Sequence, residues 1–149
     1  MKTYNIGILG NRIQIQEIQD SLKQYVYSQN SSQYNFIAIL PSTYAQSNRK
    51  ISEVLSSYDL IIALDSFVEE VNTSTLDLIR RANYEQPDLK NKIRLFIEQT
   101  NYNAYHLLDK KKFEDYSEIV NNLNEVNYCL HDHMNENFNI ATMQLLEQL

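Results

Sequence analysis

The residues of this sequence best suited to bind a ligand come directly after apolar runs of the chain. They are Gly10, Asn11, Arg12, Asp65, Ser66 and Thr100. In an open parallel α/β sheet, the loops at the carboxyl ends of the strands meet at one edge, and ligands bind there. The amino ends of the helices that follow these loops favour an anion. We therefore expect Arg12 and Asp65 to flank a site for a small anionic ligand, the alternative being an ordinary surface arginine and a loop or helix-capping aspartate.

Two histidines late in the chain could bind a metal ion. In an extended segment, residues two apart face the same side, so His131 and His133 could reach one ion. A third ligand would have to come from elsewhere, and the remaining histidine is His106. Cys129 is the single cysteine, which excludes an internal disulfide and a site built of several thiolates. A polar surface loop explains the histidine pair more simply, so we expect neither a metal nor a cofactor.

The composition is that of a globular chain with an acidic surface. Hydrophobic residues make up 43% and charged residues 21% of the 149 residues, a balance typical of a folded domain. The net charge of -6 repels phosphate backbones, so we expect no nucleic-acid partner. No apolar run approaches the roughly 18 residues that a membrane span needs, and the chain enters a strand pattern at Tyr4 without a signal peptide. We therefore expect no membrane contact and a cytoplasmic location.

Strand and helix patterns alternate along the chain and must position these residues. The predicted strands are Tyr4–Leu9, Phe36–Leu40, Leu60–Leu64, Ile93–Ile97 and Val126–Leu130. Apolar residues at helical spacing run onward from Ile15, Ile51, Leu76, Phe113 and Ile140. The predicted N-caps are Ser47 or Asn48 for the second helix and Thr73 or Ser74 for the third.

Strands separated by helices of this length favour a parallel sheet with right-handed crossovers. The sequence therefore predicts a single α/β domain over residues 1–149. Its architecture is a three-layer sandwich with a five-stranded parallel sheet in the order 2-1-3-4-5, the flavodoxin-like arrangement. In that order, the crevice at the carboxyl edge lies between the loops that follow the first and third strands.

The central part of the chain resembles a CheY-type receiver domain. Asp59-Leu60-Ile61-Ile62 followed by Asp65 is similar to the third strand and phosphoacceptor position of that family, and Leu76–Arg81 is similar to the helix that follows. The resemblance implies that Asp65 stands at the phosphorylated position and Thr100 at the hydroxyl position after the fourth strand. The family's acidic pair, which holds Mg²⁺, is here Gly10-Asn11, and its lysine after the fifth strand is not matched. A carboxylate without this electrostatic clamp is a poor phosphoryl acceptor, so the resemblance implies a receiver-like module that works without phosphorylation.

A second resemblance covers Pro41–Ile97 and is to nucleoside deoxyribosyltransferase-like and TIR-like domains. In these families, a strand that ends near an aspartate precedes a helix start of the Gly-Thr-x-x-Glu type. Here Thr73-Ser74-Thr75-Leu76-Asp77 occupies that place, with Asp77 instead of the glutamate and without the glycine. The resemblance implies an enzyme in which Asp77 attacks or stabilises the anomeric carbon of a nucleotide or NAD while Asp65 positions the sugar.

The leading hypothesis is a non-enzymatic regulatory or protein-interaction module whose partner is another protein or a second copy of this chain. It rests on the missing acidic pair, on the scarcity of glycine, with only 2 residues, and on the lack of a credible pair of nucleophile and base. The 11 tyrosines suit an interface, because tyrosine offers apolar area with a polar tip, but they suit a core equally well. The alternative hypothesis is a small N-glycosidase or deoxyribosyltransferase-like enzyme with Asp77 and Asp65 in its site.

Overall fold

The computed structural model describes residues 3–10, 12–29, 33–44, 50–65, 75–98, 127–128 and 136–149. In chain order, the elements are β1 (Thr3–Leu9), α1 (Arg12–Gln29), β2 (Gln33–Ile39), α2 (Pro41–Tyr44), α3 (Ile51–Ser56), β3 (Leu60–Asp65), α4 (Thr75–Glu85), the 3₁₀ helix η1 (Pro87–Asn91), β4 (Ile93–Glu98), β5 (Asn127–Tyr128) and α7 (Glu136–Leu146). None of the helices in these ranges is long and apolar enough to cross a membrane.

The strands form a parallel sheet in which β1 lies between β2 and β3. β1 pairs with β2 from Thr3, opposite Gln33, to Leu9, opposite Ile39. On its other side β1 pairs with β3, which in turn pairs with β4. The predicted α/β class and the parallel order 2-1-3-4 are therefore confirmed. In the place predicted for the strand Val126–Leu130, the two-residue segment β5 pairs in parallel with β4.

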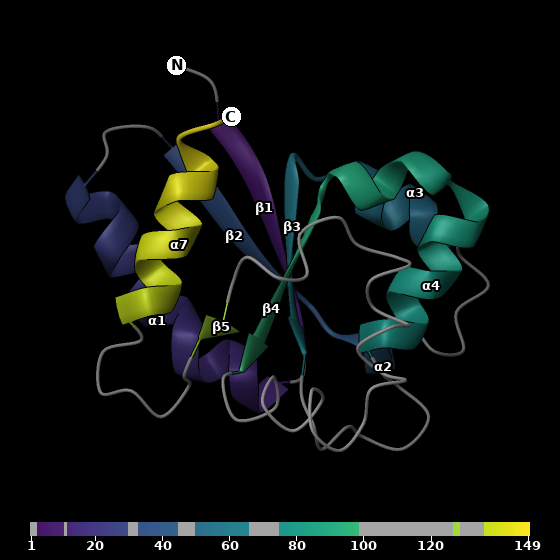
Figure 1. Ribbon diagram of the computed structural model, residues 1–149, viewed down its shortest axis with the longest axis horizontal. Helices are drawn as coiled ribbons and strands as arrows, with labels where there is room; N and C mark the ends of the chain where they lie inside the picture. Colours follow the sequence, from purple (N-terminus) through teal and green to yellow (C-terminus); the bar gives the residue numbers. More distant parts are fainter. Residues whose placement is uncertain are drawn as a thin grey trace.

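Helices cover both faces of this sheet. Successive side chains of a strand point to opposite faces, so each face presents apolar side chains that need to be buried. On one face, Ile6 of β1 and Phe96 of β4 belong to a buried cluster with residues of α1 and α7. On the other face, Leu9 of β1 and Leu95 of β4 belong to a second cluster with residues of α3, α4 and η1. Figure 1 shows α1 and α7 together on one side of the strands, and α3 and α4 on the opposite side. β3 is buried from Leu60 to Leu64 because it contributes to both clusters.

Most differences from the predicted elements lie at their ends. β2 begins at Gln33, before the predicted start, because its polar first residues continue the pairing with β1. Lys50, and not Ser47 or Asn48, is the N-cap residue of α3, and its side chain makes no capping hydrogen bond. The predicted caps Thr73 and Ser74 and the predicted helix over residues 113–123 lie outside the described residues.

The buried side of α7 agrees in part with the one that its apolar spacing predicts. Met143 and Leu146 are buried as expected, but Ile140 is 40% exposed, so its predicted place on the buried face is wrong. Asn139 and Thr142 are buried instead. Asn139 Nδ2 donates a hydrogen bond to Ser21 Oγ of α1 at 3.1 Å. This contact gives the buried amide nitrogen a partner and so favours the observed orientation of α7, whereas Thr142 Oγ1 is buried without a hydrogen-bond partner among the described residues.

α3 is a six-residue helix whose ends are capped by residues distant in the sequence. At its amino end, the Ser52 N–H donates to Glu85 Oε1 of α4 at 2.9 Å. At its carboxyl end, Lys92 Nζ donates to the carbonyl oxygens of Ser56 and Tyr58 at 3.1 and 3.2 Å. An acidic group at the amino end and a cation at the carboxyl end both complement the helix dipole. At the amino end the Glu85 contact takes the place of a local side-chain cap, whereas at the carboxyl end the Lys92 contacts add to a local one, in which Ser57 Oγ donates to the Val54 carbonyl oxygen at 2.7 Å. The distant contacts hold α3 against α4 and the start of β4.

Glu85→Ala removes the acceptor for the Ser52 N–H, and Lys92→Met removes the donor to the two carbonyl oxygens. We expect each change to lower the free energy of unfolding by about 1 kcal/mol, measured by urea denaturation. Glu85→Gln keeps an acceptor for the Ser52 N–H, so its free energy of unfolding should fall clearly less. The remaining loss comes mainly from the missing negative charge, which interacts favourably with the helix dipole. Asp88→Ala, at an exposed position of η1, is the matched control. Equal stability of the Glu85→Ala, Lys92→Met and control variants would show that α3 does not depend on these caps.

Gly7 of β1 allows two large side chains to pack closely over the sheet. A Cβ atom at this position would lie 2.6 Å from Ile39 Cδ1 and 3.3 Å from Tyr58 Cδ1. Ile39 is 1% exposed, so its terminal methyl group is surrounded by other core atoms and has little room to move. The absence of a side chain at Gly7 is therefore a packing requirement of this face.

Gly7→Ala is expected to lower the free energy of unfolding by roughly 1–2 kcal/mol, as overpacking of a core does, even though alanine reduces the entropy of the unfolded chain. Thermal denaturation followed by circular dichroism measures the loss. The double variant Gly7→Ala/Ile39→Val removes the methyl group that the new Cβ would meet, so it should be less destabilised than the sum of its two single variants. Purely additive losses would mean that the two positions do not clash.

Candidate functional site

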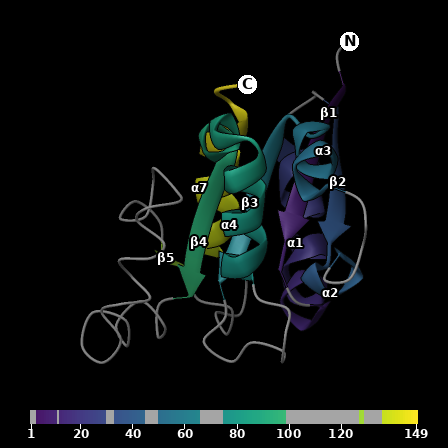
Figure 2. The same cartoon turned by 90° about the vertical axis from the view of Figure 1, so that its right-hand side faces the viewer.

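The carboxyl ends of the strands meet at one edge of the sheet, which we call the carboxyl edge. Leu9 of β1 lies opposite both Ile39 of β2 and Ala63 of β3. Asp65, the last residue of β3, lies opposite Ile97 of β4. Figures 1 and 2 show β1, β2 and β4 running toward the same end of the molecule, where α2 also lies. The chain moves from β1 to β2 on one side and reaches β3 on the other, so the switch point of this sheet lies between β1 and β3.

The structure brings three of the predicted site residues to the carboxyl edge. Gly10 is buried, and its N–H donates to the Ile39 carbonyl oxygen at 3.3 Å. Arg12 is the first residue of α1 and is exposed. Leu9 pairs with Ala63, so Asp65, two residues later, is level with the connection between β1 and α1. Arg12 and the backbone of Asp65 therefore belong to the same edge, as the topology predicts.

The other predicted site residues are described only in part or not at all. Those outside the described residues are Asn11, Ser66, Thr100, His106, Cys129, His131 and His133. Asp77 is the third residue of α4, so its backbone lies in the first turn of that helix. The side chains of Asp65 and Asp77 are not among those described, and a carboxylate pair at this edge stays a prediction.

The start of α1 at the carboxyl edge carries groups that favour a negative charge. α1 begins with the exposed guanidinium of Arg12 and has no acidic residue in its first turn. The amino end of the helix and the arginine therefore both favour a negative group. Thr43 of α2 is also exposed at this edge. Among the described residues, no three histidine, cysteine, aspartate or glutamate side chains gather into a cluster that could hold a metal ion.

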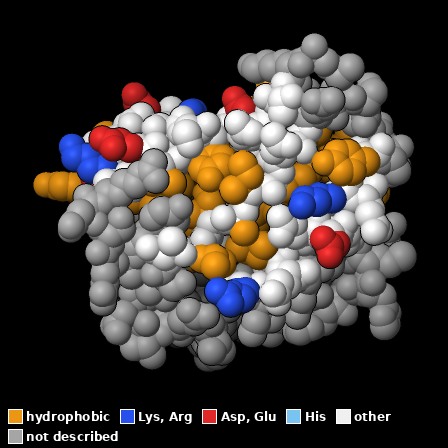
Figure 3. Space-filling model, turned by 180° about the vertical axis from the view of Figure 1, so that it is seen from behind, with side chains coloured by type: hydrophobic (Ala, Val, Ile, Leu, Met, Phe, Trp, Pro, Cys, Tyr) orange, Lys and Arg blue, Asp and Glu red, His pale blue; other side chains and the backbone are white. Residues whose placement is uncertain are grey.

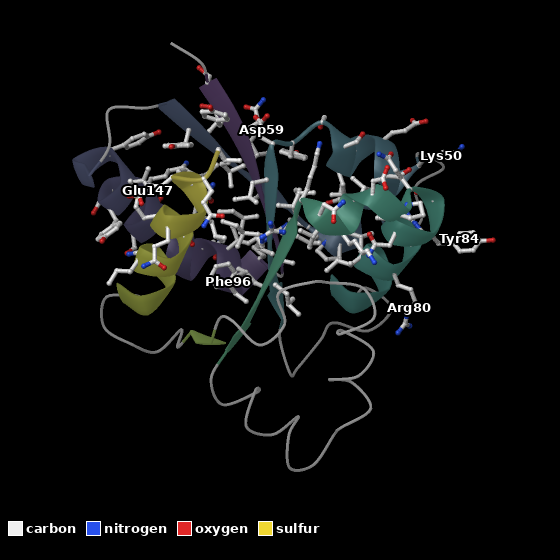
Figure 4. The ribbon with its side chains drawn as sticks, turned by 45° about the horizontal axis from the view of Figure 1, so that its top comes forward. Lys50, Asp59, Arg80, Tyr84, Phe96 and Glu147 are labelled. Atoms are coloured by element: carbon white, nitrogen blue, oxygen red, sulfur yellow. The ribbon has the colours of Figure 1, made fainter. Side chains whose placement is uncertain are left out.

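Asp59 belongs to the same stretch of sequence as Asp65 but lies at the opposite edge of the sheet. Asp59 Oδ2 accepts a hydrogen bond from the Asn5 N–H at 2.8 Å, and the Asp59 N–H donates to the Asn5 carbonyl oxygen at 2.8 Å. Figure 4 shows Asp59 at the amino ends of β1 and β3, far from Arg80 on α4. This carboxylate therefore starts the pairing of β1 with β3 and takes no part in the carboxyl edge.

Several side-chain hydrogen bonds that the sequence did not predict are made by residues whose sequence pattern is typical of the surface. Gln19 and Tyr27 of α1 donate to backbone oxygens of β2, and Glu85 of α4 caps α3. Helical spacing offers a partial signal for the first two, because residues eight apart lie on the same side of a helix. No local pattern signals the Glu85 contact, because its partner Ser52 lies 33 residues earlier in the chain.

Asp59→Ala is expected to lower the free energy of unfolding by about 1 kcal/mol, because it removes the acceptor for the Asn5 N–H at the start of the sheet. The amide hydrogen of Asn5 should also exchange faster with solvent, which nuclear magnetic resonance measures directly. Asp59→Asn keeps a carbonyl oxygen at this place, so its free energy of unfolding should fall less than that of Asp59→Ala. Asp20→Ala, at an exposed position of α1, is the control. An unchanged exchange rate at Asn5 in the Asp59→Ala variant would argue against this role.

No protein-family model and no curated protein matches this sequence. Its function is therefore inferred from the strand order, the residues at the sheet edges and the contacts that they make.

Proposed function

We propose that the chain is a non-enzymatic regulatory or protein-interaction module with a degenerate receiver-like fold. The observation that carries the proposal is the parallel order 2-1-3-4, which brings the end of β3 beside the connection between β1 and α1. A receiver that accepts a phosphoryl group needs acidic residues at that connection to hold Mg²⁺, because the developing charge must be neutralised. The connection here is Gly10-Asn11, which carries no charge. An uncharged connection next to Asp65 supports a role in binding.

In this proposal, β5 is part of a complete fifth strand, and the fold is a flavodoxin-like three-layer sandwich in the order 2-1-3-4-5. The parallel pairing of β5 with β4 supports this extension. The two buried clusters, one on each face of the sheet, support the three layers.

The partner that we propose is another protein or a second copy of this chain, and it binds at the carboxyl edge. The location that we propose for the chain is the cytoplasm. The exposed Arg12 at the start of α1 supports an acidic group of the partner, or a small anionic ligand, as the feature recognised there. The net charge of -6 disfavours a nucleic-acid partner, because phosphate backbones would be repelled.

A small N-glycosidase or deoxyribosyltransferase-like enzyme is the second candidate. One observation favours it. Asp65 ends β3, and the next described element, α4, carries Asp77 in its first turn, so both residues follow the same strand end. Two carboxylates at one edge are the groups with which glycosidases hold and attack a sugar.

Photo-crosslinking at the carboxyl edge tests the interaction proposal. A photoreactive amino acid placed at Thr43 of the full chain, which leaves Arg12 in place, is expected to give a discrete protein adduct, because the partner covers this edge. The same amino acid at Asp88 or Lys90 of η1, which precedes β4 at the opposite edge, is the matched control and should give none. Adducts are separated by electrophoresis and identified by mass spectrometry. Equal yields from the two edges, or no adduct from either, would refute the proposal.

Assays for chemistry separate the two candidate functions. Incubation with acetyl phosphate and Mg²⁺ is expected to leave Asp65 without added phosphoryl mass, and incubation with NAD or deoxynucleosides is expected to release no base. Phosphorylation of Asp65 would contradict the degenerate receiver. Base release that Asp77→Asn abolishes would establish the enzyme in place of the module.

A further inference from the structure

The buried side of α7 is half polar where the structure describes it. Its buried residues are Asn139, Thr142, Met143 and Leu146, which are 3%, 0%, 7% and 1% exposed. They recur at positions i, i+3, i+4 and i+7, so they lie on one side of the helix. A helix that covers a sheet gains most from apolar residues at such positions. Asn139 and Thr142 therefore contribute less to the attachment of α7 than apolar residues would.

Thr142 is the unfavourable member of this set. Its Oγ1 atom is buried and finds no hydrogen-bond partner in the part of the chain that the structure describes. A hydroxyl taken out of water without a partner costs free energy, and the cost is recovered when the group returns to water. The penalty applies while α7 lies on the sheet and vanishes when the helix moves away. The buried hydroxyl of Thr142 therefore shifts the balance toward a detached α7.

Two hydrogen bonds that join α7 to other elements can be exchanged for bonds to water. Asn139 Nδ2 donates to Ser21 Oγ of α1 at 3.1 Å in a partly buried place, and the Tyr4 hydroxyl donates to the Leu149 carbonyl oxygen at 3.4 Å in an exposed one. α7 also follows all the described strands in chain order, and the pairing of β1 to β4 involves none of its residues. The helix can therefore leave the sheet while these four strands stay paired.

Apolar burial is what keeps α7 in place. Met143 and Leu146 belong to the same buried cluster as Phe96 of β4, together with residues of β1, β3 and α1. Detachment of α7 would expose part of this cluster to water, which opposes the movement. The surface that it would uncover is separate from the hydrophobic side chains already exposed on the side of β2 (Figure 3), among them Ile37, which is 39% exposed.

We infer that α7 is a latch, which detaches from the sheet as a unit while β1 to β4 stay paired, and that the buried hydroxyl of Thr142 sets how often it does so. In the closed state, Met143 and Leu146 complete the apolar cluster around Phe96. In the open state, that cluster is accessible from the side of α7. Segments that open in this way are drawn from the least stable parts of a structure, and a buried polar group without a partner marks such a part. The latch goes beyond the proposed function, which concerns the carboxyl edge and needs no movement of α7.

Native-state hydrogen exchange of the full chain, followed by nuclear magnetic resonance at a series of low urea concentrations, tests the latch. The amides of residues 140–146 are expected to share one opening free energy that is smaller, and depends less on urea, than that of residues 6–9 in β1, because opening exposes less surface than unfolding. Thr142→Val removes the hydroxyl at similar helix propensity and should slow exchange of the α7 amides roughly tenfold. Thr142→Ser keeps the hydroxyl but loses a methyl group, so it should speed that exchange. Thr43→Val makes the first change at an exposed threonine of α2 and should leave exchange in α7 unaltered.

The latch is refuted if the α7 amides share the opening free energy and urea dependence of β1, because the helix would then leave only when the whole chain unfolds. It is also refuted if protection falls steadily toward the end of α7, which is fraying, or if Thr142→Val keeps a native circular dichroism spectrum and exchanges no more slowly. If Thr142→Val does not fold, the comparison of α7 with β1 in the unaltered chain decides alone. None of these measurements involves a partner of the carboxyl edge, so the latch and the proposed function can fail independently.

Discussion

The pairing of β1 with a strand on each side is the constraint on which the rest of this structure depends. At one end of β1 the backbone of Asn5 is held by Asp59, and just beyond the other end Gly10 is held by Ile39. Both faces of β1 are also covered by buried clusters, so the strand has to be apolar, with room only for a glycine at Gly7. Once β1 is in place, the parallel register sets the level at which β2 and β3 end. The position of the carboxyl edge is thus a consequence of the core.

The sequence predicts the central strands correctly because their signals are local. Leu60–Leu64 is an unbroken apolar run, and such a run has to be buried on both faces wherever the chain goes. The start of β2 carries no such signal, since Gln33 and Asn35 are polar. They are in a strand because β1 lies alongside, where Asn35 Nδ2 donates to Asn5 Oδ1 at 3.2 Å. A partner distant in the sequence decides the structure there, and no local pattern contains that information.

The same distinction explains which parts of the candidate site were predictable. The parallel order alone places Arg12 and the end of β3 at one edge, so periodicity suffices to predict that they meet. Side-chain contacts depend on details that periodicity does not contain. Apolar spacing puts Ile140 on the buried face of α7, but the helix leaves Ile140 exposed and buries Asn139, which donates a hydrogen bond to Ser21. Polar residues that find a partner can thus replace apolar ones at a helix interface.

The two kinds of edge in this sheet place opposite demands on the residues beside them. At the carboxyl edge α1 begins with the exposed Arg12, and the first N–H groups of a helix have no partner within it, so both features favour a negative group there. At the outer side of β2, exposed backbone groups are a liability, because any extended segment can pair with them. α1 serves both edges, since its first residue faces the former while Gln19 and Tyr27 cover the latter. A change that moves α1 along the sheet would therefore alter the residues beside both edges at once.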